Sequence, residues 1–319
     1  MGGADFIHLL FSEFLNFDPD DPAWINRDRF FLDPGHMSPM LYSILHLTGH
    51  YSTEDLMQFR QWGSCTPGHP ELDTGRGVEN TSGPLGQGHV MAVGCAIAQR
   101  VLAARLGDWL DHRVFAFLSD GSIQEEISQG AGRIAGRLGL GNLIMFFDSN
   151  DIQLSTRVDE VTEEDTGKKY ESWNWHVQTI DGNDEEAIRT AMASAIRETE
   201  RPSLIIGKTR MGLGAVAGDG APMEGLTSTH GQPLSKAGVS VEKTILHLGD
   251  IVMAVGIPAE LGKNLFKPYF STKTQGTGMG LALTEKLIGQ HGGQVDFESG
   301  TQGTTFRITL PLEPPRDEL

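Results

Sequence analysis

The sequence predicts an α/β fold, in which a doubly wound, mostly parallel sheet carries helices on both faces. Two short apolar runs, residues 114–118 and 143–147, are typical of buried parallel strands. Between these runs Ile127, Ala131, Ile134, Ala135 and Leu138 recur at helical spacing, which predicts an amphipathic helix over residues 125–138. Further strand and helix patterns alternate along the chain, which favours βαβ units.

The other elements follow from the same kinds of pattern. Ser52 and Asp184 are expected helix caps, because their side chains accept hydrogen bonds from a first turn. Residues 212–225, rich in Gly and Ala, predict a loop. The expected helices are residues 5–16, 41–47, 89–106, one opened by Ser52 and one running from Asp184 to Arg197, and the expected strands are residues 175–180 and 203–206.

Polar residues follow the two apolar strands, with Asp120 after the first and Asn150 after the second. A right-handed crossover brings both turns to the carboxyl edge of the sheet, where open α/β sheets bind ligands. Carboxylate, amide and carbonyl oxygens suit Mg²⁺ or Ca²⁺, and an adjacent helix N-terminus favours a phosphate. The alternative is that Asp120 only caps the helix that follows it.

Several sequence signatures occur in order around this turn. They are residues 119–125 with Asn150, and residues 27–30, 35–36, 66–71, 77–79, 81–88 and 228–234. Together they resemble the N-terminal, thiamine diphosphate-binding half of transketolase, over about residues 1–249. The resemblance implies the thiamine diphosphate-binding fold for this segment.

The resemblance also implies a cofactor, thiamine diphosphate with Mg²⁺ (or Ca²⁺). The metal ligands would be the side chains of Asp120 and Asn150 and the carbonyl of Ile152. Residues 83–86 would place backbone amides against the cofactor, an approach that requires glycine. The cofactor-binding residues implied in this way are His36, Gly83, Pro84, Leu85, Gly86, Asp120, Gly121, Asn150 and His230.

Three residues would have catalytic roles if the resemblance holds. His69 would contact the substrate hydroxyl near the reacting carbon, and His230 would act beside the diphosphate. Imidazole suits these roles, because its pKa lies near 7 and it both donates and accepts protons. Glu125 would face a partner subunit in a carboxylate relay.

The implied activity is transfer of a two-carbon ketol unit between sugar phosphates. The segment corresponds to the diphosphate-binding half only, so we expect it to work as a homo-oligomer or with a second subunit that carries the pyrimidine-binding domain. Two alternatives remain open. One is a non-catalytic truncated or fused product with a vestigial cofactor site, and the other is an ATP-binding sensor-kinase module.

Two substitutions depart from the family pattern at the motif itself. Ser119 replaces the first Gly, which requires a negative φ there, and Glu126 replaces a later Gly. Glu126 adds negative charge near the expected diphosphate, and we expect it to weaken binding.

The sequence changes character near Asp250, which predicts domains at residues 1–249 and 250–319. Residues 265–273, 276–283 and 303–306 resemble the C-terminal part of a sensor histidine-kinase ATPase domain. Val252 and Ala254 stand where that family has the adenine-binding Asp and a Gly, and valine cannot accept the adenine hydrogen bond. We expect a small, incomplete α+β segment with a helix to about residue 290 and a hairpin of residues 294–298 and 304–310.

Composition sets outer limits on function. The chain has 319 residues and a net charge of −17, which disfavours nucleic acid as a partner. No membrane-spanning run or signal peptide is expected, and Cys65 and Cys95 lack metal-site spacing. These features predict a cytoplasmic protein.

Overall fold

The computed structural model describes residues 2–154, 156–231, 236–252, 294–300 and 303–309. The chain divides into two compact units, which are considered separately. Unit 1 comprises Met1–Leu213 with Met223–Ala237, and unit 2 comprises Gly214–Pro222 with Gly238–Leu319.

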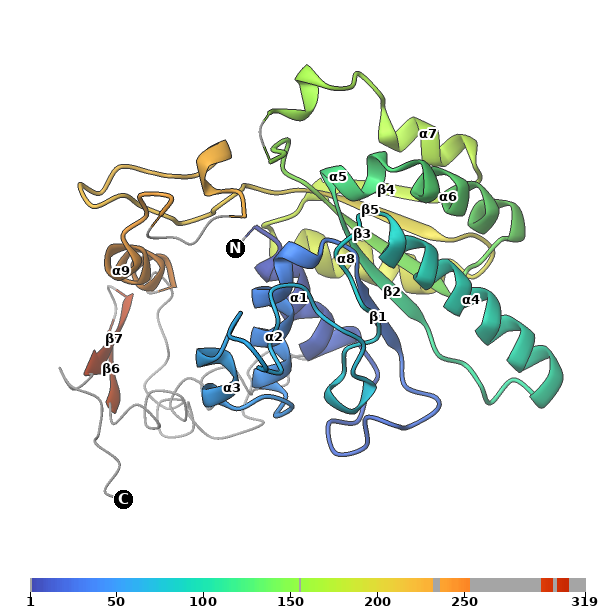
Figure 1. The fold of residues 1–319 in the computed structure, drawn as a ribbon, viewed down its shortest axis with the longest axis horizontal. Coiled ribbons are helices and arrows are strands. Elements are labelled where there is room, and N and C mark those ends of the chain that lie inside the picture. Colours follow the sequence, from blue (N-terminus) through green and yellow to red (C-terminus); the bar gives the residue numbers. More distant parts are fainter. Residues whose placement is uncertain (1, 155, 232–235, 253–293, 301–302, 310–319) are drawn as a thin grey trace. The chain divides into compact units, whose positions relative to one another are not determined.

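Unit 1 is built on a five-stranded sheet in the order β1-β2-β3-β5-β4, and every neighbouring pair is parallel (Figure 1). This confirms the predicted parallel α/β architecture. The strands are β1 Arg29–Leu32, β2 Val114–Ser119, β3 Leu143–Ser149, β4 His176–Asp181 and β5 Ser203–Lys208.

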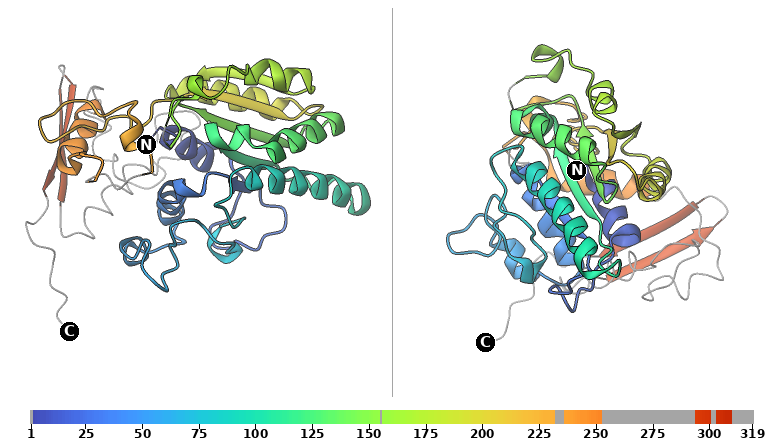
Figure 2. Two further views of the ribbon diagram at one scale, coloured as in Figure 1. Left: turned by 45° about the horizontal axis from the view of Figure 1, so that its top comes forward. Right: turned by 90° about the vertical axis from the view of Figure 1, so that its right-hand side faces the viewer.

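Helices cover both faces of this sheet (Figure 2). One face carries α1 Ala4–Leu9, α2 Ser38–Leu47 and α8 Glu185–Arg197. The other carries α4 Gln87–Leu106, α6 Glu126–Leu138 and α7 Thr166–Ser172. The shorter helices of the unit are α3 Thr53–Met57 and α5 Asp120–Gln124, with a π-helical turn at Leu10–Phe14 and a 3-10 turn at Gly35–Met37.

The core follows the two-residue period of the strands. In β2, Phe115 and Phe117 pack on the α1 side, while Ala116 and Leu118 pack on the α4 side. All six residues of β2 and all seven of β3 are buried, as expected for central parallel strands. Phe6 of α1 stacks on Phe146 of β3 with ring centroids 4.0 Å apart.

Most predicted elements are confirmed, with informative exceptions. The helix expected at residues 125–138 begins one residue later, because Glu125 is extended (φ −62°, ψ 137°) and separates α5 from α6. Of the predicted apolar stripe, Ala131 and Ala135 are buried, whereas Ile127, Ile134 and Leu138 are exposed. Strand β1 and helix α7 were not predicted.

Helix α4 is long and apolar enough, by length and composition alone, to cross a membrane. It is the one such helix in the described part of the chain, and the sequence analysis expected none. It packs along β1 and β2 and against α6, which is the position of a helix on a folded sheet. The length and composition of α4 therefore carry no argument for a membrane.

In unit 2, α9 Val241–Val252 precedes an antiparallel hairpin of β6 Gln294–Gly300 and β7 Gly303–Thr309. The hairpin confirms the expected pairing of these segments. The helix predicted to end near residue 290 and the motifs at residues 265–283 lie outside the described residues.

Candidate cofactor site

Asp120 lies at the carboxyl edge of the sheet, as the first residue of α5. The cap of this helix is Ser119, whose hydroxyl accepts the Ser122 N–H and whose φ is −116°. The alternative that Asp120 only caps the helix is therefore wrong, and Ser119 meets its requirement of negative φ. The buried Asp120 Oδ2 instead accepts the N–H groups of Asn150 and Asp151, each at 3.1 Å.

The turn after β3 is held in a defined shape. The Asn150 side-chain oxygen accepts the Ile152 N–H at 3.1 Å. Asp151 has φ of +62°, a left-handed conformation that is uncommon for residues other than glycine. One turn thus joins Asp120, Asn150 and Ile152, the three residues predicted to bind the metal. Such local strain is often found at binding sites.

Two further groups lie at this edge and were missed from sequence. Lys208, the last residue of β5, donates to the Ser149 hydroxyl at 2.8 Å and lies 3.7 Å from the Asp151 carboxylate. Asp148, in β3, accepts a short hydrogen bond from the Thr209 hydroxyl. We call Asp120, Asp148, Asn150, Asp151 and Lys208 the strand-end cluster.

Burial, together with the nearby carboxylates of Asp148 and Asp151, raises the pKa of Asp120 to about 7, against the opposing backbone hydrogen bond from Asn150. Burial also raises the pKa of Asp148. A divalent cation would offset this concentration of negative charge and hold Asp120 ionised. Across the described residues no three His, Cys, Asp or Glu side chains form a metal site, so the cation would rely on carboxylate, amide and backbone oxygens. This donor set fits Mg²⁺ or Ca²⁺.

The predicted glycine loop, residues 83–86, packs directly on the Asp120 turn. A Cβ on Gly121 would lie 2.7 Å from Leu85, and a Cβ on Gly86 would lie 2.9 Å from the Glu125 Cβ. Gly86 also has φ of +86°, which glycine adopts without strain. The loop backbone therefore approaches the strand-end cluster as closely as glycine permits, which fits a cradle for a diphosphate.

Asp33, which no sequence pattern indicated, fixes this loop. Its fully buried carboxylate accepts the N–H of Gly86 at 2.9 Å and of His89 at 3.0 Å. It thus caps the N-terminus of α4 from outside the helix, where a negative charge is favourable. No local signal reveals this contact, since Asp33 is 53 residues from Gly86.

Three predicted histidines meet on the other side of the glycine loop, and we call them the histidine cluster: His36, His69 and His230. The rings of His36 and His230 stack with centroids 5.0 Å apart. A Cβ on Gly35 would lie 2.9 Å both from the His69 ring and from the Gly83 N. The structure therefore brings residues from four segments of the sequence together.

Two members of the histidine cluster, His36 and His230, are uncharged near neutral pH. Burial, together with the neighbouring His230 and His69, lowers the pKa of His36 to about 4. Burial also lowers the pKa of His230, whose Nδ1 is buried with no hydrogen-bond partner within the described structure. A buried imidazole nitrogen without a partner fits a position that a polar ligand would satisfy.

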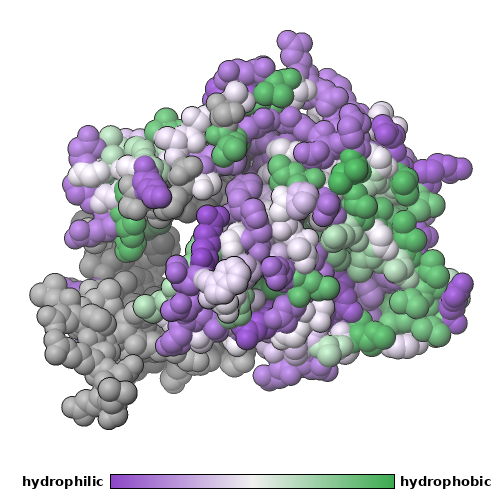
Figure 3. Space-filling model, viewed as in Figure 1, coloured by the Kyte–Doolittle hydropathy of each residue, from purple (hydrophilic) through white to green (hydrophobic). Residues whose placement is uncertain are grey.

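Glu125 lies apart from both clusters, exposed at the junction of α5 and α6. Beside it is an apolar surface formed by α4 and α6, visible in Figure 3. The exposed apolar side chains of this α4–α6 face are Val90, Met91, Val101, Leu102, Leu106, Ile127, Ile134 and Leu138. A contiguous exposed surface of this kind marks an interaction site more often than not.

Comparison with known proteins agrees with this geometry. The family described as "Transketolase, thiamine diphosphate binding domain" matches residues 1–272. A second family, described as "Histidine kinase-, DNA gyrase B-, and HSP90-like ATPase", matches residues 234–314, most of which lie outside the described residues.

Individual relatives give the same result. A transketolase of Buchnera aphidicola is 46% identical over 249 residues, covering 76% of this chain and 37% of that protein. Transketolase 2 of Escherichia coli is 44% identical over 249 residues, with the same coverage. The solved transketolase of Leishmania mexicana superposes with a TM-score of 0.70 at 33% identity, covering 78% of this chain and 40% of that chain.

The fold and the site together define a thiamine diphosphate-binding α/β domain. The chain belongs to the transketolase family, and it corresponds to the N-terminal, thiamine diphosphate-binding part of that enzyme. Members of the family use thiamine diphosphate with a divalent metal, typically Mg²⁺ or Ca²⁺. The chain spans a little over a third of the length of the curated relatives that it matches.

Proposed function

We propose that this chain is the cofactor-binding part of a transketolase, which transfers a two-carbon ketol unit between sugar phosphates. The observation that carries the proposal is the convergence of the strand-end cluster, the glycine loop and the histidine cluster within unit 1. Its similarity to transketolases over three quarters of its length supports the same activity.

The strand-end cluster holds the diphosphate through a cation. Asp120, Asn150 and the Ile152 carbonyl bind Mg²⁺ or Ca²⁺, and Lys208 adds a positive charge beside it. The glycine loop, Gly83 to Gly86 with Pro84 and Leu85 between them, presents its backbone to the diphosphate, and Leu85 packs over Gly121. Bound thiamine diphosphate supplies a carbanion sink, and the protein orients it.

The histidine cluster orients the cofactor and substrate. His36 is neutral near pH 7 because of its lowered pKa, so it hydrogen-bonds without adding charge. The unpartnered Nδ1 of His230 is ready to bind a polar group of the cofactor or substrate. His69 is exposed beside these residues, where it contacts the substrate hydroxyl near the reacting carbon.

A partner completes the site. The transketolase family is homodimeric, and the exposed α4–α6 face beside Glu125 supports a subunit contact there, with Glu125 in a carboxylate relay. We propose that a second subunit supplies the pyrimidine-binding domain. We place the protein in the cytoplasm, as for its homologues.

For the C-terminal region we propose a boundary near residue 250 and an incomplete ATPase-type segment over residues 250–319. The match to the ATPase family and the paired β6 and β7 support this assignment. Val252 and Ala254, in place of the adenine-binding residues, argue against nucleotide binding.

Calorimetric titration with thiamine diphosphate tests the proposed function. We expect heat of binding with Mg²⁺ present and none after chelation with EDTA. A matching titration adds the separately expressed pyrimidine-binding half of a relative, and there we expect tighter binding and ketol transfer. No heat under either condition would favour the non-catalytic alternative.

A further inference from the structure

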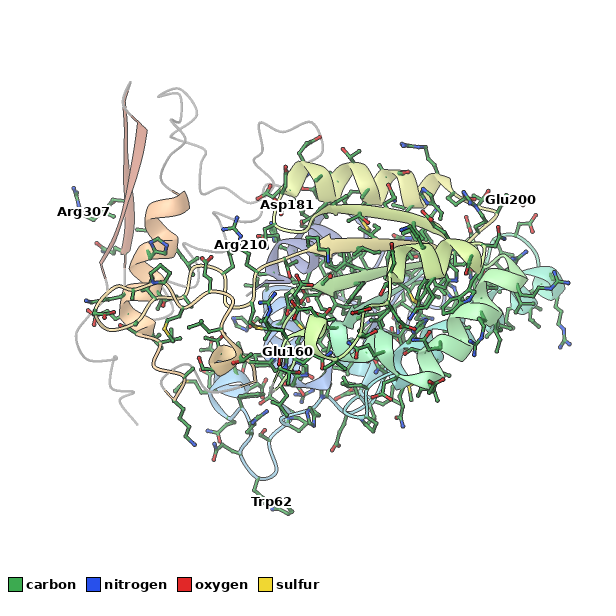
Figure 4. The ribbon with its side chains drawn as sticks, turned by 90° about the horizontal axis from the view of Figure 1, so that it is seen from above. Trp62, Glu160, Asp181, Glu200, Arg210 and Arg307 are labelled. Carbon is green, nitrogen blue, oxygen red and sulfur yellow. The ribbon has the colours of Figure 1, made fainter. Side chains whose placement is uncertain are left out.

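The two edges of the described sheet end differently. At one edge β4 ends at Asp181, which is exposed (Figure 4), whereas at the other edge the end of β1 is buried. Asp33, directly after β1, donates its N–H to the Phe117 carbonyl of β2 at 3.1 Å. Because backbone groups alternate in direction along a strand, the N–H and the carbonyl of Leu32 point away from β2. Leu32 is 1% exposed, so these two groups require partners within the protein.

The side chain of Asn80 supplies both partners. Its Oδ1 accepts the Leu32 N–H at 3.2 Å, and its Nδ2 donates to the Leu32 carbonyl at 3.1 Å. The carboxamide thus pairs with the outer side of β1 as the backbone of a neighbouring strand would. Asn80 is itself only 4% exposed, and a buried donor or acceptor that loses its partner is costly. This contact therefore holds the chain firmly at Asn80.

The next residue of the strand end, Asp33, holds the chain at a second point. Its carboxylate accepts the N–H groups of Gly86 and His89, as described above. A Cβ on Gly88 would lie 2.7 Å from the Asp33 Cα, so the first turn of α4 begins directly against the end of β1. Two consecutive residues, Leu32 and Asp33, therefore fix both ends of the segment 80–86, which contains the glycine loop.

Between these two anchors the glycine loop approaches both clusters of the candidate site. A Cβ on Gly35 would lie 2.9 Å from the Gly83 N, and a Cβ on Gly121 would lie 2.7 Å from the Leu85 side chain. Neither approach leaves space for a displaced loop. A binding loop that is already fixed in its bound conformation loses less entropy when the ligand binds, which increases affinity. The anchor at Asn80 therefore bears on how the loop backbone meets a diphosphate.

We propose that Asn80 is a positioning residue for the cofactor, since its pairing with Leu32, while Asp33 holds Gly86, fixes the backbone of the glycine loop against the diphosphate. The proposal rests on the proposed cofactor-binding function and deepens it. It assigns part of the affinity to a buried carboxamide whose own hydrogen bonds are made to a strand edge.

Calorimetric titration of the full chain with thiamine diphosphate in Mg²⁺ tests this role. Asn80→Leu has a similar size and removes both hydrogen bonds, and it should raise the Kd roughly tenfold. The matched control is Asn142→Leu, at the amino end of β3. It removes a carboxamide that donates to the Ala96 carbonyl at 3.0 Å and to Gln99 at 2.8 Å. The control should lower stability and leave the Kd unchanged, because Asn142 lies away from the glycine loop.

Asn80→Asp adds a pH profile that a general loss of stability would not produce, and it serves as the test if Asn80→Leu does not fold. The ionised carboxylate accepts the Leu32 N–H but cannot donate to the Leu32 carbonyl, whereas the protonated carboxyl group does both. Burial favours the protonated form. The ratio of the Kd of Asn80→Asp to that of the unmodified chain should therefore fall as the pH is lowered from about 8 to about 6.

Amide hydrogen exchange of the free chain gives an independent readout. In Asn80→Leu the Leu32 N–H loses its acceptor, and the Ser82 N–H, which donates to the Pro70 carbonyl at 3.0 Å, lies in the released loop. Both should exchange faster, while the amides of β3 keep their rates. A general loss of stability, as in Asn142→Leu, would instead speed exchange across the sheet.

The outcomes separate the two proposals. Equal Kd values in Asn80→Leu and Asn142→Leu, or a Kd ratio for Asn80→Asp that does not change with pH, would overturn the positioning role alone. Unchanged exchange at Leu32 and Ser82 would do the same. Absence of thiamine diphosphate binding in the unmodified chain is instead a failure of the proposed function.

Discussion

The strand-end cluster and the histidine cluster lie beside the two ends of one glycine loop but are built differently. Asp120 and Asn150 are fixed by hydrogen bonds to the backbone at the ends of buried strands. His36 lies in the 3-10 turn at Gly35–Met37, His230 follows another 3-10 turn, and their rings stack, with the Nδ1 of His230 left without a partner in the described structure. The strand-end cluster is therefore rigid and concentrates buried negative charge. The histidine cluster is adaptable and close to neutral.

In the proposed function, the two clusters would contribute differently to ligand binding. A buried carboxylate among other carboxylates requires a cation, so it contributes strongly to affinity. Neutral imidazoles contribute single hydrogen bonds of ordinary strength, so they contribute more to orientation. Substitutions in the two clusters should therefore differ in size.

The largest effect is expected for Asp120→Ala. Removing this carboxylate takes away the charged ligand of the cation, and the Kd for thiamine diphosphate in Mg²⁺ should rise on the order of a hundredfold or more. Calorimetry measures the change. Asp181→Ala, at the exposed end of β4, is the control and should bind normally. Similar affinity in the Asp120 and Asp181 variants would remove the contrast between the clusters.

His89 differs from the histidines of the histidine cluster, because it lies in the core. His89 is fully buried, neither ring nitrogen has a partner in the described structure, and burial lowers its pKa to about 3. In the unfolded chain this histidine has a pKa of roughly 6.5, so below that pH the unfolded state binds more protons than the folded state. The contribution of His89 to the free energy of unfolding is therefore fully present above that pH and falls as the pH drops toward 3. The expected slope from this group is at most about 1.4 kcal/mol per pH unit.

Urea unfolding at pH 7, 6 and 5 measures this slope. His89→Leu should flatten the profile, whereas His8→Leu, at an exposed position, should not. An unchanged slope in His89→Leu would show that acid sensitivity arises elsewhere.

The loop between the clusters should depend on Gly86. Alanine there would have φ of +86° and a Cβ 2.9 Å from the Glu125 Cβ, and we expect the free energy of unfolding to fall by about 2 kcal/mol. Gly94 of α4 offers a matched control, since its Cβ would meet open space. Gly94→Ala should stabilise the protein by roughly 0.5 kcal/mol or more. Denaturant unfolding of both variants distinguishes a required glycine from a tolerated one.

The smallest effects are expected in the histidine cluster. His36→Asn and His230→Asn should each weaken thiamine diphosphate binding by about three- to tenfold, the value of one neutral hydrogen bond. Losses as large as that of Asp120→Ala would mean that an imidazole carries charge in the complex. The same titration calorimetry provides the measurement.

The sequence predicts that the Asp120 and Asn150 turns meet, because apolar runs identify buried strands and parallel topology sends their ends to one edge. It predicts the convergence of the histidines only through the family resemblance, since no local period relates His36 to His230. Asp33 and Lys208 escaped notice for the same reason: their partners are distant along the chain.

Errors in the fold have equally local causes. Strand β1 has four residues and begins with Arg29, so it is too short for an alternating pattern. The predicted apolar stripe of α6 is only partly buried, because Ala131 and Ala135 face the core while Ile134 is exposed. Periodicity measures amphipathicity and does not distinguish a core face from a subunit contact.

The position of the cation tests the central claim most directly. Crystals of the chain grown with thiamine diphosphate and Mn²⁺, a metal that also prefers oxygen ligands, would give an anomalous signal at the metal. The account predicts one peak bound by the Asp120 carboxylate, the Asn150 amide oxygen and the Ile152 carbonyl. A bound diphosphate with the manganese elsewhere, or with none at Asp120, would contradict it.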